Sequence, residues 1–296
     1  MIIDVHAHVF AGAILRRNRD SDLTFMTVEE QIRRMDEKGV DMAVILPLNA
    51  AEAPAEGQSI WEVLHLQQQY PDRLIPFCDV DPRRVDLQSA ADFQWVLEQY
   101  REVGCRGLGE LTTRLPFDHP RMLWLFEACE NVGFPVTFHT QPPDIDSYGV
   151  VDEIGFPRFE SVLRQFPALR FFGHSGAFWS EISGDLKPEH KQGYPKGPVA
   201  PGGALVRLFR AYPNLNGDLS AGSGFNALTR DPAFTYGFLD EFQDRLMLGL
   251  DHTNPTLDFQ HIEWLQATRD DGHISAEVCE KILWRNANRL IGLGLE

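Results

Sequence analysis

Five side chains that can bind a divalent metal stand at the ends of separate apolar runs of the chain. They are His6, His8, His139, His174 and Asp251. Imidazole nitrogens and carboxylate oxygens bind zinc and other first-row metals, and one ion needs several of them around a single point. Their shared position therefore predicts one metal site, built from segments that lie far apart in the sequence.

The first two candidates occur together in the run IIDVHAH. Residues i and i+2 of a strand point to the same side, so His6 and His8 can bind one ion together. Taken alone, such a pair is as often accidental or hydrogen-bonded within the core. The three further candidates at equivalent positions favour the metal site.

The other three candidates extend this set. His139 is predicted to be a metal ligand, the alternative being a buried histidine bonded to a backbone carbonyl. His174 is predicted to be a ligand or a proton carrier beside the metal. Asp251 ends an apolar stretch in which an unpaired carboxylate would be costly to bury. We therefore expect it to bind the metal or to act as a general base toward water there; the alternative is a cap on the turn before Pro255.

Glu110 and Arg114 lie in the run CRGLGELTTR. Glu110 has the same position relative to an apolar run as the five candidates. It is predicted either to bind metal or to hydrogen-bond a ligating histidine or the substrate. Arg114 could bind a substrate carboxylate through two parallel hydrogen bonds, although an arginine in a loop is usually solvated or in a surface ion pair. The role of Glu110 decides whether one or two ions bind.

Other residues are weaker candidates. Three polar residues lie near the expected mouth of the site, although the first could simply end a strand: Asp218, His252 and Asn254. Three aromatic residues could line a pocket or pack in the core: Tyr148, Phe178 and Trp179. Five histidines fall on expected helices or loops and are interpreted as non-catalytic: His65, His119, His190, His261 and His273.

The elements that must position these residues follow a repeating pattern. Short β-branched or aromatic runs alternate with helical patterns, which is typical of βα units and a parallel sheet. Eight such runs predict strands at residues 2–8, 42–48, 74–80, 107–111, 136–140, 169–174, 215–219 and 246–251. Closed by right-handed crossovers, they predict an α/β fold of the (β/α)8 TIM-barrel type, in one domain over residues 1–296. The candidate residues would then converge at the carboxyl ends of the strands.

Helix signals fall between the predicted strands. Thr27 with Glu30 forms a capping box, and Ser59 with Glu62 repeats the pattern. Asp118 is expected to cap a helix over residues 119–131. Further helices are predicted near residues 87–103, 157–166, 204–212, 231–242 and 276–283.

One segment breaks this pattern. Residues 187–203, KPEHKQGYPKGPVAPGG, are dense in glycine and proline and have no apolar period. The segment follows the sixth predicted strand, so it would lie at the face of the barrel where loops form active sites. It is interpreted as a possible lid insertion over the substrate, and a merely irregular excursion is the alternative.

The composition favours an enzyme that acts on small molecules. A formal net charge of -16 over 296 residues argues against a nucleic-acid partner or an anionic membrane surface, which need clustered Lys and Arg. Four cysteines in apolar or helical surroundings show no CxxC spacing, as expected for reduced, buried thiols. With no signal peptide or long apolar run recognised, we expect a cytoplasmic protein.

Several motifs together resemble the amidohydrolase superfamily. They are DVHAH, TFHT, GHSGAFW, GLDHTNP and the closing ILWRNANRLIGL. The similarity is greatest to the amidohydrolase-related branch of metal-dependent hydrolases that contains aminocarboxymuconate-semialdehyde decarboxylase, and it extends over essentially the whole chain. The resemblance implies a distorted TIM barrel with a divalent metal bound by His6, His8, His139 and Asp251, with His174 beside it. Zinc is the expected metal and manganese the next; a homodimer is a possible assembly.

Two positions depart from the resemblance. Leu250 replaces the usual serine before the aspartate, which would alter the pocket wall more than the metal. Glu110 matches the bridging acid of two-metal hydrolases in the superfamily rather than a residue of the decarboxylases. If Glu110 bridges, the resemblance implies one ion bound by His6, His8 and Asp251 and a second bound by His139 and His174.

The expected function is a metal-dependent hydrolase. Water activated by the metal would attack a small ester, lactone or amide, with Asp251 as the general base. The alternative is a metal-dependent, non-oxidative decarboxylase of a small unsaturated or aromatic acid, in which Asp251 or His174 would manage protonation of the carbon. A DNase-like member disagrees with the net charge. A barrel that only binds a ligand would not explain candidates at all five strand ends.

Overall fold

The computed structural model describes residues 1–12, 22–49, 51–52 and 57–296. Eight parallel strands follow one another in chain order: β1 (Ile3–Ala7), β2 (Met42–Ile45), β3 (Leu74–Pro76), β4 (Leu108–Leu111), β5 (Val136–Gln141), β7 (Phe171–His174), β8 (Leu215–Asp218) and β9 (Leu246–Met247). A short additional strand, β6 (Val150–Val151), pairs with the end of β5. Seven of the eight lie within the segments predicted as strands, and β5 extends one residue beyond its predicted segment, to Gln141.

Backbone hydrogen bonds join the two runs of paired strands, β1 to β3 and β4 to β9, into a barrel. On one side, the Cys78 N–H donates to the Gly107 carbonyl at 2.9 Å, which connects the chain after β3 to β4. On the other side, the Val5 N–H donates to the Leu248 carbonyl at 2.9 Å, which connects β1 to the chain after β9. The predicted (β/α)8 barrel is therefore confirmed.

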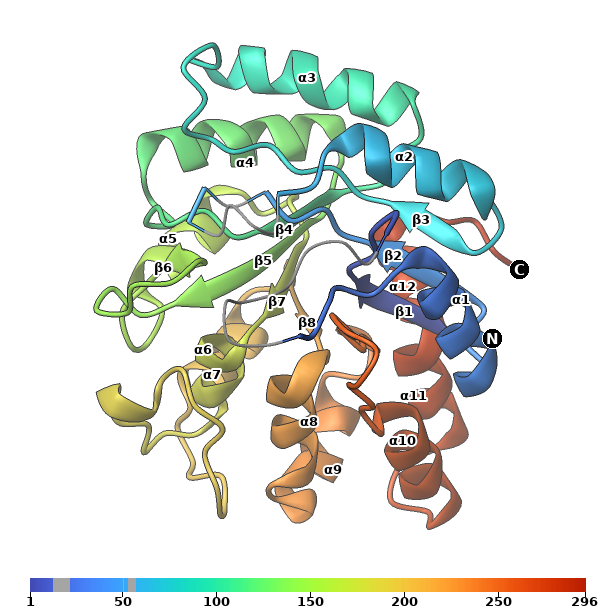
Figure 1. Cartoon of the computed structure of the whole chain (residues 1–296). Coiled ribbons are helices and arrows are strands. Elements are labelled where there is room, and N and C mark those ends of the chain that lie inside the picture. Colours follow the sequence, from blue (N-terminus) through green and yellow to red (C-terminus); the bar gives the residue numbers. More distant parts are fainter. Residues whose placement is uncertain (13–21, 50, 53–56) are drawn as a thin grey trace.

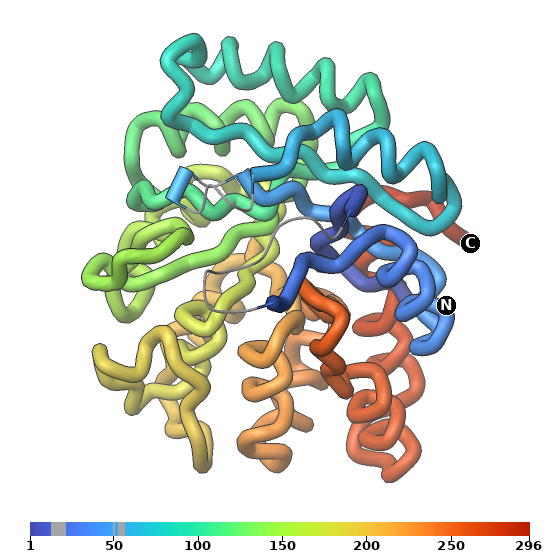
Figure 2. The backbone as a smooth tube through the Cα atoms, viewed as in Figure 1, coloured from blue at the N-terminus to red at the C-terminus, as the bar shows by residue number. Residues whose placement is uncertain are grey.

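Helices surround the barrel (Figure 1). Their bounds are α1 (Val28–Lys38), α2 (Ile60–Gln69), α3 (Ala90–Glu102), α4 (Pro120–Val132), α5 (Pro157–Gln165), α6 (Gly176–Trp179), α7 (Ala204–Ala211), α8 (Ala221–Thr229), α9 (Pro232–Glu241), α10 (His261–Asp270), α11 (Ala276–Glu280) and α12 (Asn286–Ile291). A π-helical turn, Lys281–Arg285, links the last two. The backbone tube passes once around the barrel and brings both termini to the same side (Figure 2), where Ile3 and Leu295 share an apolar cluster.

The predicted capping box is confirmed at α1 and half formed at α2, where the Glu62 carboxylate accepts from the Ala11 N–H at 2.8 Å instead, and the predicted cap of α4 is wrong. The Thr27 side chain and Glu30 form the full capping box of α1, and the Ser59 hydroxyl accepts from the backbone at the start of α2. Asp118 does not cap α4. The His119 ring accepts from the Arg121 N–H instead, at 3.2 Å, because the Asp118 carboxylate is paired with Arg158 at 2.8 Å.

Helices α6, α8, α10 and α12 and strand β6 were not predicted. The α8 sequence, AGSGFNALT, is rich in small residues with weak helix propensity and has no side-chain cap. Helix α10 also begins without a side-chain cap. Tertiary packing therefore decides these elements more than local sequence does.

An aromatic cluster lies beneath the strand ends that carry the candidate residues. The Phe138 ring on β5 packs edge-to-face against Phe117, Phe159 and Phe178. A Cβ at Gly173 would lie 2.2 Å from the Phe178 ring, so only glycine lets β7 pack directly on α6. This contact fixes the position of the next residue, His174.

The structure also bears on the cysteines and on membrane-spanning helices. All four cysteines are buried and their thiols are free. Across the part of the chain that the structure describes, no helix combines the length and apolar character needed to cross a membrane.

Candidate metal centre

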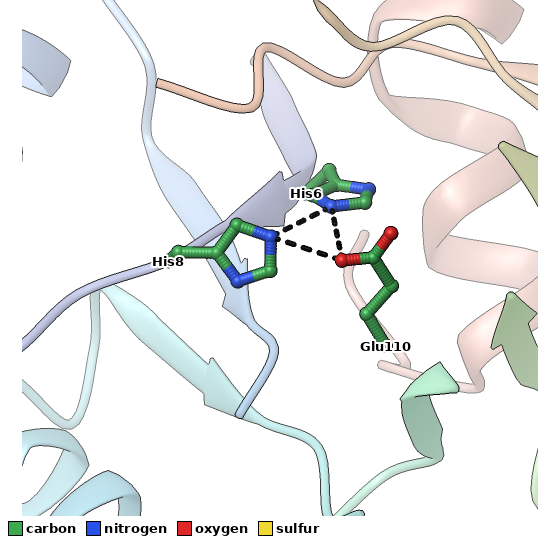
Figure 3. A group of neighbouring side chains, drawn as sticks. All are labelled: His6, His8 and Glu110. Atoms are coloured by element: carbon green, nitrogen blue, oxygen red, sulfur yellow. Dashed lines mark hydrogen bonds and ion pairs between the residues drawn. The ribbon is translucent and has the colours of Figure 1, made fainter. Parts of the chain in front are cut away.

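His6 of β1, His8 just after this strand and Glu110 of β4 point toward one another at the carboxyl end of the barrel (Figure 3). The Nε2 atoms of His6 and His8 lie 3.0 Å apart. Glu110 Oε2 is 3.7 Å from His6 Nε2 and 3.3 Å from His8 Nε2. All three side chains are buried. Three potential ligand atoms therefore converge at one point.

The other oxygen of Glu110 faces a second pair of histidines. Oε1 lies 3.0 Å from His139 Nδ1 and 3.8 Å from His174 Nε2. His139 lies in β5 and His174 ends the adjacent strand β7, and the two residues are paired in register. Glu110 thus lies between a His6–His8 half and a His139–His174 half of one cluster, with one oxygen toward each.

Asp251 also contacts both halves. Its Oδ1 atom is 3.5 Å from His8 Nε2, and its Oδ2 atom is 3.7 Å from His174 Nε2. The Asp251 N–H donates to the His6 carbonyl at 2.8 Å, and its φ of 53° places the backbone in the left-handed region. Such a conformation is unfavourable for a non-glycine residue. The β1 contact therefore holds the carboxylate over the cluster in a conformation that the chain would otherwise avoid.

Hydrogen bonds behind the cluster orient three of the rings. His6 Nδ1 lies 2.5 Å from Asp218 Oδ2, His8 Nδ1 lies 2.8 Å from the Leu46 carbonyl, and His174 Nδ1 lies 2.7 Å from Ser220 Oγ. A proton on Nδ1 of His6 and His8 satisfies these acceptors and leaves the Nε2 lone pairs facing the cluster. The rings are therefore arranged to bind a cation through Nε2.

Asp218, a weak candidate from its sequence position, and Ser220, which was not predicted, both support the cluster. Asp218 does end a strand, β8, as the alternative interpretation held, but its side chain is fully buried against His6. The signal available was its position, because it ends a strand between those of His174 and Asp251. An acidic residue there is costly to bury unless a protonated or metal-bound group faces it.

Asp218→Asn is expected to lower the affinity for a divalent metal by about 10- to 100-fold, the usual effect of removing a carboxylate that orients a ligating histidine. Titration with zinc against a chromophoric chelator measures this directly. Ser220→Ala, which loosens His174 rather than His6, serves as the comparison. Wild-type affinity in Asp218→Asn would show that the carboxylate does not support binding.

The charges of the cluster suit a cation. Burial lowers the pKa of His6, but the carboxylates of Asp218 and Asp251 outweigh it and leave that pKa well above its ordinary value. Burial raises the pKa of Glu110, but hydrogen bonds from His139, His6 and His8 hold it well below its ordinary value. Burial raises the pKa of Asp251. Without a cation, a buried imidazole must carry the positive charge that these carboxylates need.

The environment of Asp251 Oδ1 tests most specifically whether the cluster suits a divalent metal. This atom is buried, and among the described residues it has no hydrogen-bond partner. Three groups of potential ligand atoms, each within 4.8 Å of one another, form around it and Glu110: His6 with His8 and Glu110, His6 with His174 and Asp251, and Glu110 with His139 and His174. Nitrogen and carboxylate donors at this density are typical of zinc and other first-row metal sites. The residues present therefore fit a divalent metal.

Among the weaker candidates, one aromatic residue lies beside the cluster and the others pair or pack elsewhere. Arg114 forms an ion pair with the exposed Asp146 rather than contacting the cluster. The Tyr148 ring lies 4.8 Å from the His139 ring, centroid to centroid, whereas Phe178 and Trp179 are buried in the core. His252 Nε2 accepts from the Phe259 N–H at 3.2 Å. Tyr148 is therefore the aromatic candidate that reaches the site.

His261 lies on α10 and is fully buried, and burial lowers its pKa from 6.5 to about 3. Between these values the unfolded chain binds a proton that the folded chain does not, so stability falls as the pH drops below about 6.5. We expect His261→Gln to reduce this slope by up to about 1.4 kcal/mol per pH unit. Urea unfolding in EDTA from pH 7.5 to 4.5 measures the slope, and equal slopes in variant and wild type would contradict the assignment.

Comparison with known proteins identifies a family and several solved structures of similar fold. A family model described as amidohydrolase matches residues 3–293. A probable 2-pyrone-4,6-dicarboxylic acid hydrolase from Acinetobacter baumannii, with citric acid bound, is 17% identical; the match covers 98% of this chain and 99% of that chain, with a TM-score of 0.61. No curated protein sequence matches significantly.

Two further solved structures are similar over their whole length. A 2,6-dihydroxybenzoate decarboxylase from Rhizobium is 15% identical, with 99% of this chain and 98% of that chain covered and a TM-score of 0.59. An amidohydrolase from Burkholderia multivorans with bound zinc is 13% identical, with 99% of each chain covered and a TM-score of 0.63. At these identities the likeness shows the fold, which hydrolases and decarboxylases share.

Proposed function

Because the chain belongs to the amidohydrolase family, as its motifs indicated, we propose that it is a metal-dependent hydrolase of a small ester, lactone or amide. The observation that carries the proposal is the position of Glu110, whose two oxygens face different histidine pairs. A carboxylate in this position can bridge two cations, which is the arrangement of two-metal hydrolytic sites. His6, His8 and Asp251 would hold one ion, and His139 and His174 would hold the other.

Zinc is the metal we propose, with manganese as the second choice. The donors are four imidazoles and two carboxylates, which suit zinc in particular, and one relative of the same fold contains bound zinc. When bound, such a cation supplies Lewis acidity, which lowers the pKa of water and polarises a carbonyl oxygen.

The residues of the chain would handle the proton. Asp251 Oδ1 is buried and without a hydrogen-bond partner among the described residues, which supports a role as acceptor of a proton from the attacking water. The water oxygen bonds to the acyl carbon, the bond to the leaving oxygen or nitrogen breaks, and the leaving group receives that proton from Asp251. The products are a carboxylic acid and an alcohol or amine.

His174 would be neutral at physiological pH and would bind metal through its Nε2 atom. Burial lowers its pKa to about 3, and Ser220 Oγ lies 2.7 Å from its Nδ1 atom. Its Nε2 atom therefore faces Glu110 and Asp251, where it can bind the second cation.

The second candidate function is non-oxidative decarboxylation of a small unsaturated or aromatic acid. The hydrogen-bond distance of 3.0 Å between His139 and Glu110 favours it, because a glutamate that only orients His139 leaves a single metal. Asp251 or His174 would then protonate the carbon that loses carbon dioxide. A 2,6-dihydroxybenzoate decarboxylase with a similar fold supports this second candidate.

A substrate panel tests the choice. Zinc-loaded protein is incubated with neutral and carboxylated lactones and esters, and separately with hydroxybenzoic acids and unsaturated dicarboxylic acids. We expect acid release from a lactone or ester, followed by pH indicator, and loss of that activity in His6→Ala. Carbon dioxide release without hydrolysis would reject the hydrolase in favour of the second candidate.

A further inference from the structure

The segment interpreted from sequence as a lid forms a closed excursion beside β7 and α6. The Gly184 N–H donates to the Ala200 carbonyl at 2.9 Å. A Cβ at Gly203 would lie 2.0 Å from the Ile182 carbonyl oxygen, so the chain returns tightly against the point from which it left. Residues 184–203, here called the excursion, are thus closed at their base.

A buried lysine holds the middle of the excursion. Lys191 is 1% exposed, and its Nζ atom lies 2.6 Å from Glu181 Oε1 and 3.0 Å from the Glu153 carbonyl. The same atom lies 4.3 Å from the centroid of the Phe156 ring. An ammonium group with partners on two neighbouring segments fixes the backbone around it, because any movement would leave a buried charge unpaired. The excursion is therefore held in place at Lys191.

The residues after Lys191 lie over the carboxyl end of β7. A Cβ at Gly176 would be 2.9 Å from the Gln192 carbonyl oxygen, and Gly176 follows the cluster residue His174 by two positions. Glycine at 176 therefore permits close approach of the excursion to the strand end that carries a candidate ligand.

Tyr194 follows and reaches the opposite side of the mouth. Its hydroxyl would be 3.3 Å from a Cβ at Gly222, in the first turn of α8. The Ala221 N–H of the same turn donates to the Leu250 carbonyl, so this turn adjoins Asp251. Burial and the charge of Asp251 both raise the pKa of Tyr194, yet the residue is 57% exposed. The phenol is therefore close to the cluster and open to solvent.

We propose that Tyr194 contacts the substrate by donating a hydrogen bond from its phenol to a substrate oxygen, and that the Lys191–Glu181 pair positions it. This inference rests on the proposed hydrolase function for the identity of the substrate. The phenol is held on a fixed segment, so it can bind a ligand without first having to order the chain. Tyr194 thus acts in substrate binding, and Lys191 is a positioning residue.

The location of Tyr194 is tested without any activity measurement. All six tyrosines are replaced by 3-fluorotyrosine, and 19F spectra are recorded while Mn²⁺ is added. We expect paramagnetic broadening of the Tyr194 signal, assigned by its loss in Tyr194→Phe, and of the Tyr148 signal, because the Tyr148 ring lies 4.8 Å from the His139 ring. Tyr236, which stacks on His273, is the distant control. A Tyr194 signal as sharp as that of Tyr236 would overturn the proposal.

The role of Tyr194 is tested with the best hydrolysed ester or lactone of the panel. Tyr194→Phe, an exposed change that keeps the ring, is expected to raise KM by about 10-fold with kcat within about twofold, the effect of one lost hydrogen bond. Tyr236→Phe is the matched control. Lys191→Met should raise KM similarly and sharpen the Tyr194 signal, with no further rise in the double variant. An unchanged KM in Tyr194→Phe would overturn the role, whereas a panel with no hydrolysed member would reject the proposed function and leave the Mn²⁺ test to decide the location.

Discussion

Asp251→Asn is expected to lower kcat for hydrolysis by about 10²- to 10⁴-fold, the usual contribution of a positioned general base. Asparagine keeps the shape of the side chain but cannot accept the proton of water. It also removes one negative charge facing His6 and His8. Steady-state kinetics on zinc-loaded protein measures the loss, and Asp240→Asn, an exposed change on α9, is the matched control.

Metal analysis of the same variant separates two roles of Asp251. If Asp251→Asn retains the metal content of the wild type while kcat falls, the carboxylate acts mainly as the base. If metal and activity are lost together, as we expect for His6→Ala, the carboxylate is mainly a ligand. An Asp251→Asn variant with wild-type kcat and metal content would contradict both roles and with them the proposed site.

Glu110→Gln is expected to lower the metal content of the protein from two ions to one and to reduce kcat by at least about 10²-fold. A glutamine amide offers one neutral oxygen in place of two charged ones, so it cannot bridge the two histidine pairs. Elemental analysis after dialysis into metal-free buffer gives the stoichiometry. Glu127→Gln, on the exposed side of α4, is the matched control.

The alternative outcomes of this experiment are equally informative. One ion in both wild type and Glu110→Gln would mean that Glu110 only orients His139, and it would favour the decarboxylase. Two ions in both proteins would mean that His139 and His174 bind the second cation without a bridge. The stoichiometry therefore tests the observation on which the proposed function rests.

Much of this architecture could be predicted because strand ends are marked in the sequence. The runs before His139 and His174 are predominantly apolar, as expected for strands covered on both faces, and the histidine that follows each run lies at the mouth of the barrel. Because parallel strands of a barrel all end at one face, the convergence of the six candidates follows from chain order alone.

Other features depend on contacts between distant segments. Asp218 lies 212 positions from His6 in sequence, and nothing local distinguishes it from an acid that merely ends a strand. Asp118 has the composition of a cap but is paired with Arg158 on another element. The predicted substrate contact of Arg114 has no support beyond its sequence position, because the side chain is paired with Asp146. In each case the partner that decides the role comes from elsewhere in the fold.

The hydrogen bond from the Asp251 N–H to the His6 carbonyl has a consequence for biosynthesis. It joins the first strand to the segment that follows the last one, and the complete ligand set exists only when both are in place. A nascent chain that has not yet emerged past β9 can form the histidine pairs but cannot close the cluster with Asp251. Under the proposed function, the complete set of donor groups would become available only after translation of nearly the entire barrel, so a metal ion would bind an already folded chain rather than nucleate its folding.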